Sequence, residues 1–124
     1  MGFREPNAVS MREENRSAIE ANGGKVLFAG HAFGMLGRAI SRKFDAMQVN
    51  EVVANVLRLF SQGVNVGCEI SCMAADAGLI RSGEEAIAIA GSGTGADTAI
   101  VLRAANTHDF FETRILEIIC KPRG

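Results

Sequence analysis

Three glycines stand within five residues between two short apolar runs, and this segment constrains the fold more than any other. The run at residues 86–90 leads into Gly91-Ser92-Gly93-Thr94-Gly95-Ala96-Asp97-Thr98, and a second run follows at residues 99–102. Short apolar runs bounded by glycine predict buried strands. Alternating glycines and hydroxyl residues let a backbone turn its N–H groups inward, as a phosphate site needs. The segment therefore predicts an anion-binding loop between two strands.

The loop matches neither of two common nucleotide-binding patterns, G-x-x-x-x-G-K-[ST] and G-x-G-x-x-G followed by a helix. The absent lysine and the strand that follows the loop exclude a P-loop NTPase. The alternative is that the glycines serve only to turn the chain, but a two-residue hairpin needs at most two of them. The extra length and the hydroxyls of Ser92, Thr94 and Thr98 favour phosphate binding. Asp97 fits an anion site least well, and it either pins the loop or binds a ribose hydroxyl.

The remaining periodicity predicts four helices and four strands in one domain spanning residues 1–124. Helices are expected at residues 10–21, 35–44, 51–61 and 64–79, and strands at residues 25–30, 85–90, 98–103 and 115–120. Ser10 and Asn50 are the expected caps of the first and third helices. The inward face of the fourth helix is expected to carry Val66, Ile70, Met73, Ala74 and Ala77.

Helices between the first strands predict parallel crossovers, and the directly linked last strands allow an antiparallel edge. The predicted class is therefore α/β with a mixed, mostly parallel sheet. One helix precedes the first expected strand, with no strand for it to cross over from. Either the sheet is small, or the chain lacks an N-terminal βα segment.

The composition of the chain excludes some classes of binding partner. The net charge is −1, so no basic excess exists to neutralise nucleic acid, and the aromatic residues, 6% of the chain, are all Phe. No run of eighteen apolar residues occurs, so a membrane span is not expected. Three cysteines without framework spacing indicate a reducing compartment, hence a cytoplasmic protein.

A few other residues could carry chemistry. His31 follows the expected strand at residues 25–30, where α/β proteins place ligand contacts, although a surface histidine bonded to a nearby loop fits equally well. Cys68 and Cys72 share a helix face, which predicts core thiols rather than metal ligands. No catalytic constellation emerges, so the sequence leaves open whether the protein is an enzyme. The expected ligand-binding residues are Gly91, Ser92, Gly93, Thr94, Gly95, Asp97, Thr98 and His31.

Five stretches in order along the chain carry a family resemblance. They are Gly2-Phe3-Arg4-Glu5-Pro6, residues 53–58, residues 73–80, residues 84–99 with the glycine-rich loop, and residues 116–123. Together they resemble the pyruvate kinase alpha/beta domain-like family, which is named for the C-terminal domain of pyruvate kinase and lacks that enzyme's catalytic barrel. The resemblance implies a three-layer α/β/α fold whose last strand is antiparallel.

The same resemblance implies phosphate contacts by Ser92, Gly93, Thr94 and Thr98, with flavin mononucleotide (FMN) or a sugar phosphate as the ligand. It also implies that this chain corresponds to the C-terminal portion of a typical member, which begins with a further βα unit and a strand.

Three functions follow as hypotheses. The first is a module that binds a phosphorylated small molecule without pyruvate kinase activity. The second is an enzyme that acts on a phosphorylated metabolite, with His31 or Asp97 as the acid–base group. The third is an assembly module whose exposed sheet face or helix stripe forms a homo-oligomer or docks an N-terminal segment.

Overall fold

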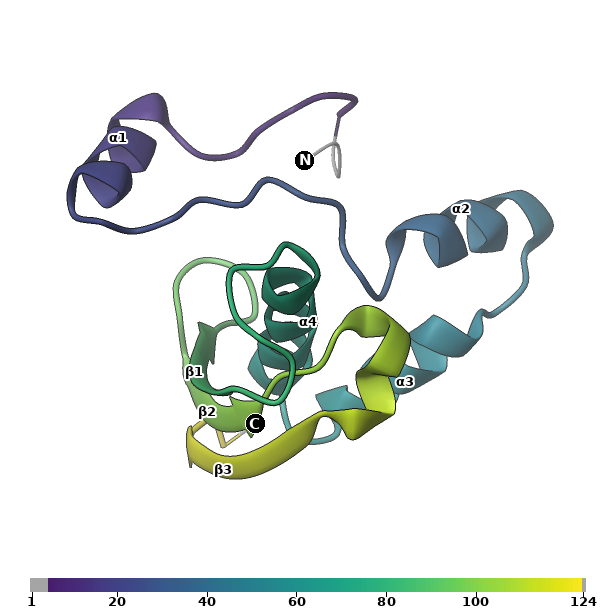
Figure 1. Cartoon of the computed structure of the whole chain (residues 1–124). Coiled ribbons are helices and arrows are strands. Elements are labelled where there is room, and N and C mark those ends of the chain that lie inside the picture. Colours follow the sequence, from purple (N-terminus) through teal and green to yellow (C-terminus); the bar gives the residue numbers. More distant parts are fainter. Residues whose placement is uncertain (1–4, 124) are drawn as a thin grey trace. The chain divides into compact units, whose positions relative to one another are not determined.

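The computed structural model describes residues 5–123 and divides between Gly30 and His31 into two compact units (Figure 1). Residues 2–4 of the Gly2–Pro6 motif lie outside the described part of the chain.

The described part of the first unit, residues 5–30, contains one helix, α1 (Glu13–Ala21). Its N-cap is Arg12, and no side chain caps it, so the prediction that Ser10 caps this helix was wrong. Its C-terminus agrees with the sequence, since the helix ends at Asn22 and Gly23 follows with a φ of +81°. Glycine adopts this left-handed conformation without the strain that a Cβ would add.

The second unit contains the sheet, whose strands are β1 (Glu85–Ala90), β2 (Thr98–Arg103) and β3 (Arg114–Cys120). Their order is β1-β2-β3, and both neighbouring pairs are antiparallel. The three strands were predicted close to these bounds. The prediction of a mostly parallel sheet in a three-layer α/β/α fold was wrong, because the second unit is a small α+β domain.

The sheet is antiparallel rather than mostly parallel because of residues 25–30, which were expected to form the first strand. The sheet of the described residues takes its three strands from residues 85–120, and Leu27 is 40% exposed rather than buried. An apolar run favours extended backbone, but only a hydrogen-bonded neighbour makes it a strand. Without this strand no βαβ unit exists, and strands joined by short connections pair antiparallel.

Four helical segments accompany the sheet: α2 (Met35–Phe44), α3 (Val49–Arg58), α4 (Gln62–Asp76) and the 3-10 helix η1 (Thr107–Glu112). The predicted helices at residues 35–44, 51–61 and 64–79 are therefore confirmed, with shifted ends. Asn50 does not cap α3. Its side-chain amide instead donates to the backbone carbonyl of Phe33 over 2.6 Å, and the cap position belongs to Gln48.

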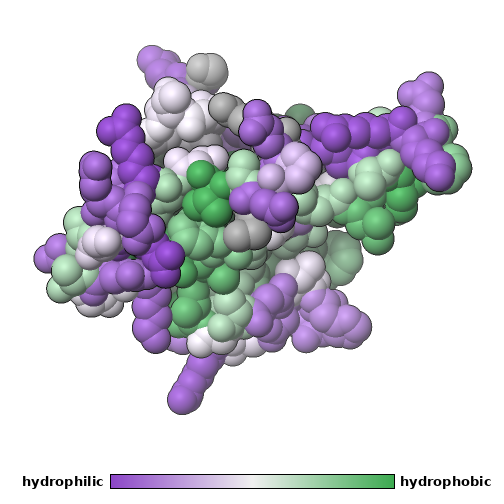
Figure 2. All heavy atoms as spheres, turned by 90° about the horizontal axis from the view of Figure 1, so that it is seen from above, coloured by the Kyte–Doolittle hydropathy of each residue, from purple (hydrophilic) through white to green (hydrophobic). Residues whose placement is uncertain are grey.

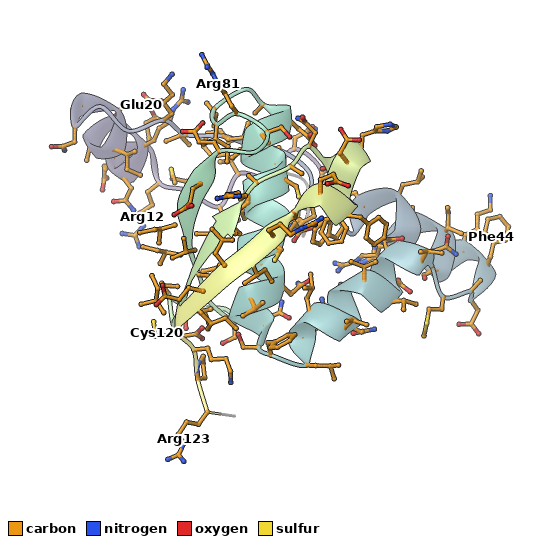
Figure 3. All side chains as sticks on the ribbon, turned by 60° about the horizontal axis from the view of Figure 1, so that its bottom comes forward. Arg12, Glu20, Phe44, Arg81, Cys120 and Arg123 are labelled. Carbon is orange, nitrogen blue, oxygen red and sulfur yellow. The ribbon has the colours of Figure 1, made fainter. Side chains whose placement is uncertain are left out.

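The core of the second unit lies where α4 crosses one face of the sheet, as Figure 3 shows. Its fully buried side chains are Val64, Cys68, Cys72, Ile100 and Leu102. The opposite face of β1 is open, because Ile87 and Ile89 are 61% and 62% exposed.

The buried face of α4 differs from the predicted one. We expected Val66, Ile70, Met73, Ala74 and Ala77 to face inward, but Ile70 and Ala77 are exposed and Val66, Met73 and Ala74 are half-buried. The helix instead buries small and polar residues, namely Gly63, Val64, Asn65, Gly67, Cys68, Glu69, Ser71, Cys72 and Ala75.

Two glycines explain why α4 buries this face of small and polar residues. A Cβ on Gly67 would lie 3.0 Å from the Ile100 side chain, and a Cβ on Gly63 would overlap the Thr98 hydroxyl. Since close packing rewards short separations, the missing side chains let α4 contact β2 more closely than a leucine-rich face would allow.

The C-terminal end of α4 is held by Asp76. Its carboxylate accepts hydrogen bonds from the Thr107 hydroxyl, the Thr107 backbone N–H and the Asn106 side chain. These bonds, that of the Thr107 hydroxyl first, lower the pKa of Asp76. Both ends of α4 are thus tied to segments that follow it in sequence.

Gly63→Val should lower the free energy of unfolding by about 1–3 kcal/mol, since the added side chain must displace buried Thr98. Gly93→Ala is the matched control, because nothing lies within 4 Å of a Cβ there, and it should change stability by less than about 0.5 kcal/mol. Urea denaturation of both variants measures this. Equal stability of the two would contradict the close contact between α4 and β2.

The three cysteines should differ in reactivity. Burial raises the pKa of Cys68 to about 12 and also raises that of Cys72, whereas Cys120 is exposed. Because the thiolate is the reactive species, a disulfide reagent at neutral pH should modify one thiol in the folded protein and three in denaturant. Rapid modification of three thiols under native conditions would contradict the described core.

Candidate functional site

The glycine-rich loop joins β1 to β2 and closes on itself. The backbone N–H of Asp97 donates to the carbonyl of Ala90 over 3.0 Å, and an isolated bridge links Gly93 to Gly95. Gly91 is required at this closure, since a Cβ there would overlap the carbonyl oxygen of Gly95, whose own φ is +89°. Gly91 and Gly95 are therefore needed to turn the chain, which is the role that the alternative to phosphate binding gave to the glycines.

Asp97 uses hydrogen-bond donors that could otherwise hold a phosphate. Its Oδ2 accepts from the Ser92 backbone N–H (3.3 Å) and hydroxyl (3.1 Å), and its Oδ1 accepts from the Thr98 hydroxyl (2.6 Å). The Thr98 hydroxyl, followed by Ser92, lowers the pKa of Asp97. Of the two roles considered for Asp97, the structure shows that it pins the loop.

The N-terminus of α4 meets this loop. Ser61 caps the helix, its Oγ accepting from the backbone N–H of Val64 over 3.1 Å. The same hydroxyl lies 3.4 Å from that of Thr98, which is 2% exposed and packs against Gly63. The positive end of the α4 dipole therefore lies next to the loop.

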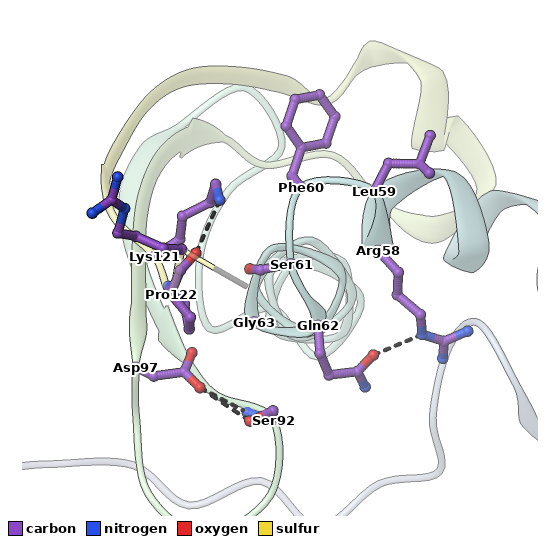
Figure 4. A pocket seen from close by; sticks show the side chains of 11 residues that line it. Arg58, Leu59, Phe60, Ser61, Gln62, Gly63, Ser92, Asp97, Lys121 and Pro122 are labelled. Carbon is purple, nitrogen blue, oxygen red and sulfur yellow. Dashed lines mark hydrogen bonds between the residues drawn. The ribbon is translucent and has the colours of Figure 1, made fainter.

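A pocket of about 410 Å³ opens at this junction (Figure 4). Its walls come from the end of α3 and start of α4, from the loop, and from the segment after β3. The lining residues are Arg58, Leu59, Phe60, Ser61, Gln62, Gly63, Ser92, Asp97, Lys121, Pro122 and Arg123.

Among the described residues, three cationic side chains and one carboxylate line the pocket. Arg58 is held by its neighbours, with Nε donating to Gln62 over 2.7 Å and a terminal nitrogen donating to Asn55 over 2.9 Å. Lys121 donates to the carbonyl of Pro122 over 3.0 Å. Arg123 adds the third positive charge, so the lining carries three positive groups against the single carboxylate of Asp97.

The predicted loop residues separate into groups. Ser92 and Asp97 line the pocket, and Thr98 lies behind Asp97 in the core. Gly93, Thr94 and Gly95 are exposed and do not line it, while Gly91 serves the closure of the loop.

His31 lies elsewhere in the second unit. Its Nδ1 is 3.2 Å from Oε2 of Glu69, whose Oε1 accepts from the backbone N–H of Phe33 over 2.8 Å. Glu69 stands six residues after Gly63 on α4, which corresponds to about 9 Å along the helix axis. His31 and Asp97 therefore contact different turns of α4 and do not form one acid–base pair.

The sequence prediction missed the cations and the helix terminus. Arg58, Lys121 and Arg123 come from segments far apart in the chain, and no local pattern links them. Ser61 was detectable, because a serine preceding an apolar helical stretch is a typical N-cap. The expected helices at residues 51–61 and 64–79 place Ser61 at the end of one helix and leave Gln62 and Gly63 between the two, whereas both residues belong to α4 and Ser61 is its cap.

Among residues 5–123, no group of three or more His, Cys, Asp or Glu side chains is placed so that it could hold a metal ion. Over the same range, none of the helices combines the length and hydropathy that crossing a bilayer requires. A comparison of the chain with protein-family models finds no matching family.

The pKa of Asp97 tests the loop geometry. Thr98→Val should raise it more than Ser92→Ala, because the Thr98 hydroxyl lowers this pKa most. Asp97 carries a lowered folded pKa, so its stabilising contribution is present above the unfolded value of about 3.9 and is lost as pH falls through the folded pKa. NMR titration of the Asp97 carboxyl carbon measures this. An unshifted pKa in the unsubstituted protein would show that these hydrogen bonds do not form.

Proposed function

We propose that the second unit is a binding module for a phosphorylated small molecule, held in the pocket beside the N-terminus of α4. The observation that carries this proposal is that three cationic residues and a helix N-terminus line one pocket. Backbone N–H groups at a helix N-terminus and cationic side chains both favour phosphate.

The polar groups of the pocket fit this ligand class. Lys121 and Arg123 lie beyond β3, and Arg58 ends α3, so cations approach the site from two segments. The Ser61 hydroxyl can donate to a phosphate oxygen, whereas the Ser92 hydroxyl already donates to Asp97. The Asp97 carboxylate already accepts the hydrogen bonds of Ser92 and Thr98. The phosphate is therefore bound by the helix terminus and the cations rather than by the loop glycines.

The apolar part of the pocket allows a larger ligand than phosphate alone. Leu59, Phe60 and Pro122 belong to the lining, and Phe60 is 52% exposed. A volume of about 410 Å³ falls within the range of small-molecule pockets. FMN and sugar phosphates have this combination of phosphate and organic body. The resemblance to the pyruvate kinase alpha/beta domain-like family remains a prediction and motivates the same choice of probes.

Binding without catalysis is better supported than an enzyme. A general base works best when its pKa is near the operating pH, and the lowered pKa of Asp97 moves it away from neutrality. His31, the other acid–base candidate, pairs with Glu69 on a different turn of α4. Cytoplasmic location is part of this proposal, because two of the three cysteines are buried free thiols that suit a reducing compartment.

Calorimetric titration with inorganic phosphate, FMN and fructose bisphosphate tests the proposal. We expect saturable binding of at least one probe, and affinity that falls as salt concentration rises. Lys121→Gln and Arg58→Gln should each weaken it roughly tenfold, the usual effect of losing one charge-assisted hydrogen bond.

Lys43→Gln and Arg81→Gln are the matched controls, because they remove the same charges at positions that do not line the pocket. Both should bind like the unsubstituted protein. Absence of binding of all three probes, or equal weakening by the pocket and control variants, would refute the proposed site.

A further inference from the structure

The pocket at the N-terminus of α4 has two unlike sides. Ser92 and Asp97 lie on one side of the helix end, and Leu59 and Phe60 lie on the opposite side, as Figure 4 shows. Both apolar side chains are accessible, Leu59 at 82% and Phe60 at 52%. Because the helix end lies between the two sides, a phosphate bound there extends its organic body toward one side or the other.

Side-chain oxygen atoms on the polar side are already hydrogen-bonded within the protein. Asp97 accepts three hydrogen bonds, two of them from Ser92. The Oε1 of Gln62 accepts from Nε of Arg58 over 2.7 Å, and the Ser61 oxygen accepts from the first turn of α4. A sugar body needs an acceptor for each hydroxyl that leaves water, because an unpaired buried hydroxyl is costly. The polar side therefore does not favour a polyhydroxylated body.

The apolar side of the pocket is distinguished by its neighbours rather than by its exposure. Leu36 and Phe44 of α2 are also exposed, and Figure 2 shows hydrophobic atoms gathered along one side of that helix, beside a hydrophilic side. Leu59 and Phe60 differ from these because they line a pocket together with three cationic residues. A ring that enters this pocket can pack against the Phe60 ring, and such aromatic pairs contribute more than their buried area alone.

The position of Phe60 in the chain sets the distance between a phosphate and such a ring. Phe60 directly precedes Ser61, the N-cap of α4, so the Cα atoms of the two residues are about 3.8 Å apart. A phosphate at the helix end and a ring against Phe60 are therefore close neighbours. A direct ester bond or a single carbon atom between them is enough to place both.

The charge of the lining matches that of one phosphate monoester. Arg58, Lys121 and Arg123 carry three positive charges and Asp97 carries one negative charge, so the lining residues sum to +2. A phosphate monoester carries about two negative charges at neutral pH, whereas a phosphate diester carries one. The lining is therefore more complementary to a monoester than to a diester.

We propose that the pocket selects phosphate monoesters with a compact aromatic body over sugar phosphates, and that Phe60 determines this selectivity. The phosphate lies against the helix end and the cations, and the ring lies against Leu59 and Phe60. This selectivity rests on the proposed function, because it requires a phosphate bound at the N-terminus of α4.

Calorimetric titration of the full chain with three ligands tests the selectivity. Phenyl phosphate and glucose 6-phosphate carry the same charged group, while methyl phenyl phosphate keeps the ring but is a diester. We expect phenyl phosphate to bind about tenfold more tightly than either of the other two, which corresponds to one favourable aromatic contact or one additional charge.

Phe60→Ala should abolish the preference for phenyl phosphate over glucose 6-phosphate, since it removes the ring from the apolar side. Phe111→Ala is the matched control, because Phe111 is an 80% exposed phenylalanine of η1 that does not line the pocket. It should retain the tenfold preference. Circular dichroism melting should show that both variants are folded. In NMR spectra of the unsubstituted chain, nuclear Overhauser effects should connect the phenyl protons of the ligand with the ring protons of Phe60.

The selectivity would be overturned by equal binding of phenyl phosphate and either comparison ligand, by an unchanged preference in Phe60→Ala, or by its loss in Phe111→Ala. Absence of the nuclear Overhauser effects to Phe60 in a saturated complex would also overturn it. Inorganic phosphate and Lys121→Gln separate this failure from failure of the phosphate site. If Lys121→Gln weakens phosphate binding while the two monoesters bind equally, the proposed function stands and the aromatic preference is wrong. If none of the anions binds, both are wrong.

Discussion

The close contact between α4 and β2 is the constraint on which the rest of the second unit depends. It exists because Gly63 and Gly67 have no side chains where Thr98 and Ile100 approach. At Gly63 the contact brings the first turn of α4 against the start of β2, and therefore beside the loop that precedes this strand. The position of the pocket is thus a consequence of helix–sheet packing.

The glycine-rich loop has a different role from the one that its composition suggests. A carboxylate within the loop, that of Asp97, accepts the hydrogen bonds of Ser92 and Thr98 and so takes the place that a bound anion would have. This internal anion gives the loop a defined shape without a ligand. The proposed phosphate site therefore relies on cations from outside the loop, namely Arg58, Lys121 and Arg123.

Local features were predictable from the sequence and long-range pairing was not. The strands on either side of the loop have clear boundaries because glycines flank short apolar runs. Residues 25–30 have the same local pattern, yet they belong to no strand, since pairing depends on distant segments. The buried face of α4 was mispredicted for a related reason. Hydrophobicity predicts which face avoids water, whereas Gly63 and Gly67 are buried because their small size permits contact.

The same limit applies to the pocket, because its walls come from segments that are far apart in the chain. Arg58 and Leu59 line it from the end of α3, and Lys121, Pro122 and Arg123 line it from the segment after β3. Neither segment by itself has a phosphate-binding pattern. The contact of α4 with β2 brings the glycine-rich loop to the α4 N-terminus, so the residues of the pocket meet only in the folded unit.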